Sequence, residues 1–141
     1  MLSALRWLMV PVSTAVGCWL GIAIALLLYA SFDFFCPADQ RVSGMCHASW
    51  FHAGAEFSQY AGAAIGAAIA VALPFFTAPS HKRAVATLAF LAGAAYALTF
   101  SWRAPGSWPY AAAAIATGLA VLAWAWHTTA FAKTPINPNA G

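Results

Sequence analysis

Charged side chains are what this sequence lacks most. Only 6% of its 141 residues are Asp, Glu, Lys or Arg, whereas 63% are hydrophobic. A soluble domain carries about 25% charged residues, so this shortage excludes a water-facing surface and indicates a lipid-facing one. The 6 basic residues are also scattered, without the basic stripe that would follow a phosphate backbone, and we therefore expect no nucleic-acid partner.

Charge is also missing from the cores of four long apolar runs, at residues 7–30, 53–76, 84–102 and 110–131. A helix needs about 20 apolar residues to cross the hydrocarbon core of a membrane. The sequence therefore predicts an all-α membrane protein, a four-transmembrane-helix bundle that forms a single transmembrane domain over residues 1–141. Pro74 and Pro79 are expected to close the second helix. The polar residues 133–141 have no apolar face and are expected to form a disordered tail.

The first apolar run has one alternative interpretation, a cleaved signal peptide. Its apolar stretch is longer than the 7–15 residues of a usual signal sequence, and a single basic residue, Arg6, precedes it. We therefore expect a retained helix.

The charges at the ends of the runs predict sidedness. If the N-terminus is cytoplasmic, the cytoplasmic segments hold four basic residues and no acid: Arg6, Lys82, Arg83 and Lys133. The opposite side then holds two basic residues and every acid: Arg41, Arg103, Asp33, Asp39 and Glu56. Cytoplasmic segments of membrane proteins are enriched in Lys and Arg. We therefore predict a multi-pass protein of the bacterial inner membrane, with both termini cytoplasmic and residues 31–52 forming a periplasmic loop.

Small residues recur at helical spacing in all four runs. Lipid is as apolar as leucine, so helices associate in membranes where small residues let their backbones approach closely. Glycines stand four residues apart twice, and single glycines continue alanine ridges in the third and fourth runs: Gly17, Gly21, Gly62, Gly66, Gly93 and Gly118. We expect these glycines to pack helices together, although the spacing in the third and fourth runs can also arise by chance.

Two of the three cysteines fall in the predicted periplasmic loop. Thiol pairs close and persist in that oxidising compartment, and Pro37 and Gly44 can reverse the chain between Cys36 and Cys46. The sequence therefore predicts a structural disulfide that pins the loop. A redox-active pair is the alternative, but the close C-x-x-C spacing of such pairs is absent and Cys18 lies within the first run.

Three residues near the start of the second run could ligate a metal. His52 and Glu56 stand four residues apart, on one face of a helix, and His47 precedes them in the loop. This combination suits zinc or copper. The alternative is that all three are interfacial polar residues.

Catalytic signatures are absent from the sequence. It contains no nucleophile–base pair, Gly-rich phosphate loop or carboxylate dyad, so we expect no enzymatic activity of the chain alone. Three functions remain: a non-catalytic subunit or assembly partner of a larger membrane complex, a metal- or redox-handling protein, and a component of an oligomeric transporter or channel. The expected partners are membrane lipids and other membrane subunits or further copies of the chain. A bound lipid is the one further ligand considered.

Overall fold

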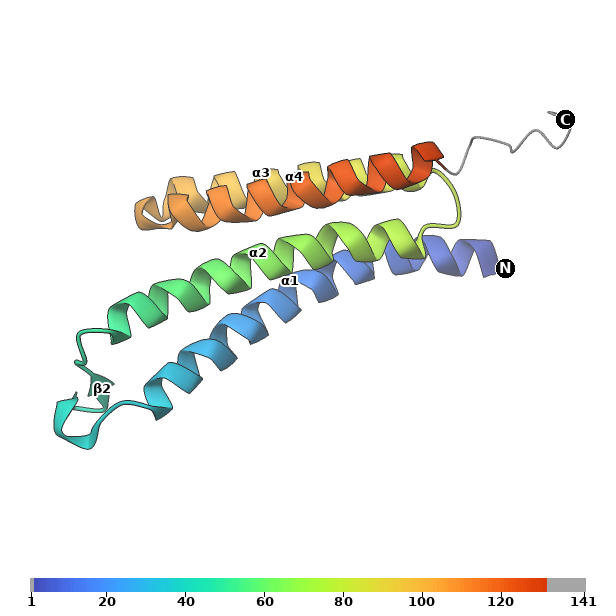
Figure 1. Cartoon of the computed structure of the whole chain (residues 1–141). Helices are drawn as coiled ribbons and strands as arrows, with labels where there is room; N and C mark the ends of the chain where they lie inside the picture. Colours follow the sequence, from blue (N-terminus) through green and yellow to red (C-terminus); the bar gives the residue numbers. More distant parts are fainter. Residues whose placement is uncertain (1, 132–141) are drawn as a thin grey trace, which may run out of the picture.

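A computed structural model describes residues 2–131, and four helices dominate it (Figure 1). They are α1 (Leu2–Phe34), α2 (Phe51–Thr77), α3 (Lys82–Arg103) and α4 (Trp108–Phe131). Each is long and apolar enough to cross a membrane, which confirms the number and kind of the predicted helices. The tail predicted for residues 133–141 lies outside the described residues.

All four helices run further than their apolar patterns predicted, and α1 does so most. α1 has 33 residues and α2 has 27, so α1 is about 50 Å long and exceeds a hydrocarbon core of about 30 Å. Of the two prolines expected to close the second helix, Pro74 lies inside α2, whereas Pro79 follows its end at Thr77 by two residues. The backbone N–H of Ala78 (3.0 Å) and the hydroxyl of Thr77 (3.3 Å) both donate to the carbonyl of Pro74 and complete the last turn.

Backbone contact joins α1 to α2. A Cβ atom placed on Gly21 would lie 2.6 Å from the Cα of Gly66, and one on Gly17 would lie 2.6 Å from the backbone nitrogen of Ala70. A Cβ on Gly62 would lie 2.5 Å from the Cβ of Ala25. Real Cβ atoms do not approach other atoms so closely, so only glycine fits at these positions. α1 packs on α2 and has at most incidental contact with α3 or α4.

The α3–α4 pair packs on α2 through a buried cluster at one end, and toward the other end the rings of Tyr60 and Tyr110 lie 4.7 Å apart between centroids. Val71 and Phe75 of α2, Ala86 of α3 and Ala125 of α4 form the buried apolar cluster. Toward the other end, the α1–α2 pair diverges from the α3–α4 pair, as Figure 1 shows. The fold is therefore wedge-shaped, closed at the end where α1 begins and open toward the end where α1 meets the loop.

A short β-hairpin occupies the connection between α1 and α2. After the 3-10 turn η1 (Ala38–Gln40), β1 (Arg41–Val42) pairs antiparallel with β2 (Met45–Cys46), so that Val42 lies opposite Met45. Ser43 and Gly44 link the strands with φ angles of 52° and 81°. Positive φ at both central residues is typical of the two-residue type I′ turn, which favours glycine. A second 3-10 turn, η2 (Pro105–Ser107), joins α3 to α4.

Candidate functional site

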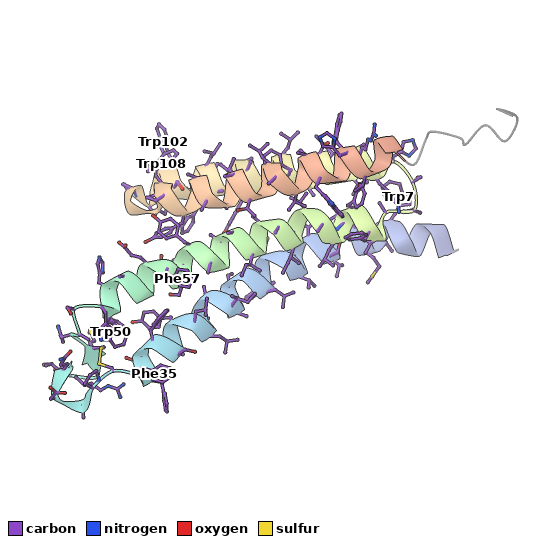
Figure 2. All side chains as sticks on the ribbon, viewed as in Figure 1. Trp7, Phe35, Trp50, Phe57, Trp102 and Trp108 are labelled. Carbon is purple, nitrogen blue, oxygen red and sulfur yellow. A yellow bond between two sulfur atoms is a disulfide. The ribbon has the colours of Figure 1, made fainter. Side chains whose placement is uncertain are left out.

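A disulfide closes the base of the hairpin. Cys36 and Cys46 are bonded, with their Cα atoms 5.9 Å apart, which confirms the predicted bridge. Figure 2 shows the yellow bond beside the labelled Trp50. Cys18 is unbonded and lies in α1. The bridge therefore ties β2 back to the end of α1.

Hydrogen bonds fix the hairpin further. The guanidinium of Arg41 donates to the backbone carbonyl of Asp33 at 2.6 Å and lies 3.5 Å from the carboxylate of the same residue. The backbone N–H of His47 donates to the carbonyl of Gln40 at 2.9 Å. Together with the disulfide, these contacts hold the hairpin in one orientation relative to α1.

Large apolar side chains remain exposed on and beside this fixed hairpin. We call Phe34, Phe35, Val42 and Met45 the hairpin apolar residues, and their exposed fractions are 81%, 73%, 58% and 69%. Val42 and Met45 share one face because they are opposite each other in the strand register. The rings of Phe34 and Phe35 contact each other at 5.7 Å between centroids. In Figure 2, Phe35 points away from the helices.

The predicted metal residues are only partly brought together. Nε2 of His52 lies 3.4 Å from Oε1 of Glu56, one turn further along α2, and the side chain of His52 is 87% exposed. Over residues 2–131, no three histidine, cysteine, aspartate or glutamate side chains gather into a group that could hold an ion. His47 therefore does not join the pair, and the zinc or copper site stays a prediction with two placed ligands.

A second feature, which we call the lateral cavity, lies between the helices. It has a volume of about 880 Å³, and residues of all four helices line it. Ligand pockets are typically about 300–1,000 Å³. Gly93, Tyr96 and Phe100 of α3 line the cavity and are exposed, as is Ile22 on the α1 side. Because α1 and α3 hardly touch, the cavity opens sideways between them.

The lining of the lateral cavity changes along its length. Toward the hairpin it includes the polar side chains of Gln59, Tyr110 and Ser107, and the hydroxyl oxygen of Ser107 lies 3.2 Å from that of Ser101. At the other end the lining is apolar and includes Val71. Among the described residues, Gln59 has no side-chain hydrogen-bond partner.

The predicted packing glycines of α3 and α4 have surroundings that differ from those of the glycines between α1 and α2. Gly93 lines the lateral cavity, and a Cβ atom placed on it would meet nothing within 4 Å. A Cβ on Gly118 would lie 3.0 Å from the ring of Phe90, a side chain rather than a backbone. Gly54, which is not one of the predicted packing glycines, has the same kind of contact: a Cβ atom placed on it would lie 2.9 Å from the ring of Phe32.

Comparison with known proteins adds no function to these two features. No protein family, no curated protein and no solved structure matches this chain. What the chain does must therefore be inferred from the chemistry of the hairpin and of the lateral cavity.

Proposed function

We propose that this protein is a small non-catalytic subunit or assembly partner of a larger complex in the bacterial inner membrane, and that it docks through the hairpin apolar residues. The observation that carries the proposal is the exposure of Val42 and Met45 on a hairpin that a disulfide holds in place, beside the exposed rings of Phe34 and Phe35 at the end of α1. Exposed apolar clusters on otherwise folded segments mark interaction surfaces.

The rigidity of the hairpin is the reason to interpret its exposed apolar side chains as a docking surface and not as an incidental exposure. Burying apolar surface contributes about 25 cal/mol per Å², but ordering a flexible loop on binding offsets much of that gain. Here the disulfide, the type I′ turn and the contact between Arg41 and Asp33 order the hairpin before any partner arrives. The apolar side chains are thus presented on a preformed surface.

The same proposal includes sidedness, with both termini cytoplasmic and the hairpin in the periplasm. In its support, Lys82 and Arg83 lie at the start of α3, at the end of the molecule opposite the hairpin, whereas Asp33 and Glu56 lie at the hairpin end. Positive residues collect on the cytoplasmic side of membrane proteins. An oxidising periplasm would also keep the bond between Cys36 and Cys46 closed. The partner would then contact this protein from the periplasmic side of the membrane.

The two other functions considered from the sequence have less support. The pair of His52 and Glu56 offers two ligands for a metal-handling role, without a third among the described residues. A transporter component would need a path through the membrane, whereas the lateral cavity opens sideways and stops at the cluster that contains Val71 and Phe75.

Substitution of Met45 by Glu tests the docking surface. A carboxylate at this exposed position leaves the strand pairing in place but makes burial against an apolar partner costly. We expect Met45→Glu to keep its normal membrane abundance and to lose the proteins that co-purify with the wild type in mild detergent. Gln40→Glu is the matched control, because it adds the same charge to the exposed turn η1 without altering the hairpin apolar residues.

Two results would contradict the proposal. If the wild type co-purifies with no other protein at constant stoichiometry, a subunit role is wrong. If Met45→Glu retains the same partner as Gln40→Glu, the subunit role stands but the hairpin apolar residues are not its docking surface.

A further inference from the structure

Acidic and basic side chains are divided unequally between the two ends of the molecule. The three acidic residues of the sequence, Asp33, Asp39 and Glu56, all belong to the hairpin end. Lys82 and Arg83 begin α3 at the opposite, closed end, where α1 also begins (Figure 1). Because all three acidic side chains lie at the hairpin end, no Asp or Glu side chain neutralises these two cations.

A hollow smaller than the lateral cavity lies at this closed end, and we call it the closed-end pocket. Its volume is about 440 Å³. One wall comes from α1 and the other from the end of α2 and its connection to α3, and the lining residues are Met9, Phe76, Thr77, Ala78, Pro79 and Lys82. Met9 and Phe76 are 48% and 60% exposed, and Lys82 is exposed as well. The closed-end pocket therefore presents one cation beside exposed apolar side chains.

Aromatic rings hold both cations in place at the closed end. Nζ of Lys82 lies 5.8 Å from the ring centroid of Phe75. The guanidinium of Arg83 lies 5.5 Å from the ring of Trp126 and donates to the backbone carbonyl of the same residue at 3.1 Å. Arg83 is thus engaged with α4, whereas Lys82 lines the closed-end pocket. The face of a ring attracts a cation but cancels none of its charge, so the ammonium of Lys82 can still pair with an anion.

The depth of Lys82 in the membrane corresponds to the edge of the hydrocarbon core. α3 has 22 residues and basic side chains at both ends, with Lys82 first and Arg103 last. Its length of about 33 Å is close to that of a core of about 30 Å, so a centred α3 places Lys82 about 16 Å from the midplane. Trp7, labelled in Figure 2, lies at the same end, and tryptophan is enriched at this level. Lys82 therefore lies next to the layer of lipid phosphates.

From these observations we propose that the closed-end pocket binds the phosphate of one anionic glycerophospholipid. The ammonium of Lys82 pairs with the phosphate, and the exposed side chains of Met9 and Phe76 contact the glycerol and the first part of an acyl chain. Arg83 adds positive potential beside the pocket, which favours an anionic lipid over a zwitterionic one whose headgroup ends in an ammonium. This site depends neither on docking of the hairpin nor on the side of the membrane that the hairpin faces.

Native mass spectrometry of the full chain in mild detergent tests this proposal. Phosphatidylglycerol and phosphatidylethanolamine with the same acyl chains are titrated separately, and the affinity for the first bound lipid is measured. We expect phosphatidylglycerol to bind about tenfold more tightly, because no headgroup ammonium opposes Lys82 and Arg83. Equal affinities for the two lipids would overturn the proposal.

Two glutamate variants on α1 separate the pocket from the overall charge of this end. Met9→Glu places a carboxylate in the closed-end pocket with Lys82, whereas Leu8→Glu adds the same charge at the neighbouring exposed position, which does not line the pocket. We expect Met9→Glu to weaken phosphatidylglycerol binding about tenfold and Leu8→Glu to weaken it no more than about twofold. Equal helicity by circular dichroism shows that both variants fold. Equal losses in the two variants would contradict a site in the pocket.

Removal of the cation gives a complementary readout. Lys82→Gln should weaken phosphatidylglycerol binding about tenfold, whereas Arg103→Gln, which removes a basic residue from the other end of α3, should leave it unchanged. Unchanged binding in Lys82→Gln would overturn the proposal. Inorganic phosphate distinguishes the two sources of a phosphate group, and a large excess of it should not displace the lipid from the wild type. If inorganic phosphate does displace it, the pocket is a site for a free anion and its assignment to a lipid is wrong.

Discussion

The two sides of α2 carry similar small residues but have different neighbours. On the side that faces α1, Gly62, Gly66 and Ala70 lie in contact with the backbone of α1. Gly62, Gly66 and Ala70 also border the lateral cavity, which Ala63 and Ala67 line on the side of α2 that faces α3. Across the cavity, a Cβ atom placed on Gly93 would meet nothing within 4 Å. The same four-residue spacing therefore accompanies both a close contact between helix backbones and the edge of an open cavity.

The difference lies in what stands opposite each glycine. Gly21 faces Gly66, so that each helix offers a small residue at the same level and the backbones meet. Gly118 faces the ring of Phe90 instead, which separates α4 from α3 at that level. Because lipid tails are as apolar as the side chains, burial alone brings no net gain, and helices come together only where both surfaces allow close approach. Spacing within one helix does not by itself specify a contact.

The largest expected effect comes from placing a leucine at the contact between α1 and α2. Gly21→Leu should lower the free energy of unfolding by about 3 kcal/mol, at the upper end for overpacking, because even a Cβ would lie 2.6 Å from the Cα of Gly66. Unfolding by sodium dodecyl sulfate in mixed micelles, followed by circular dichroism, measures the change. Gly93→Leu is the control and should change the same free energy by no more than about 1 kcal/mol. Equal losses in the two variants would remove the contrast between the two sides.

A smaller and more local effect is expected at the hairpin. Replacing Cys36 and Cys46 together by Ser should cost the hairpin up to about 3 kcal/mol, the chain-entropy estimate for so short a loop, and should leave the contact between α1 and α2 intact. Amide hydrogen exchange should become faster at Val42 and Met45 and stay unchanged at Gly66. Faster exchange along all of α2 would show that the bridge stabilises the helices as well.

The bridge also offers a check on the proposed sidedness. In protein taken from cells and alkylated after acid quenching, Cys18 should be the sole reactive thiol, because the proposed periplasmic location of the hairpin would keep Cys36 and Cys46 bonded. Three reactive thiols would mean that the hairpin does not face an oxidising compartment.

The four helices and the disulfide could be predicted from the sequence because their signals are local. Runs of about 20 apolar residues identify helices that cross a membrane, and two cysteines in one loop have few other partners. The ends of the helices were less predictable. α1 continues to Phe34 and α2 past Pro74, since helical hydrogen bonding does not stop where the apolar pattern stops.

The hairpin and the lateral cavity could not be predicted for different reasons. Each strand has two residues, too few for an alternating pattern, and the Ser43–Gly44 turn is a weaker signal than Asn-Gly. The cavity depends on how far α3 diverges from α1, and nothing local to Gly93 distinguishes it from Gly21. Of the predicted metal residues, His52 and Glu56 could be placed from helical spacing, whereas His47 belongs to the hairpin segment, whose path the sequence does not define.

The smallest expected effect comes from alanine substitutions at Gly93 and Gly21. These variants test the comparison most sharply, because the change in stability should have opposite signs on the two sides of α2. Gly93→Ala adds one methyl group in the interior of α3, where it meets nothing within 4 Å. Since alanine favours a helix over glycine by about 1 kcal/mol, the variant should be more stable by up to that amount in the same unfolding measurement. Gly21→Ala gains the same propensity but forces the backbones of α1 and α2 apart, so it should be less stable than the wild type. If Gly93→Ala is also less stable in the membrane-derived protein, a backbone from another chain must lie against Gly93. The lateral cavity would then hold a helix of that chain.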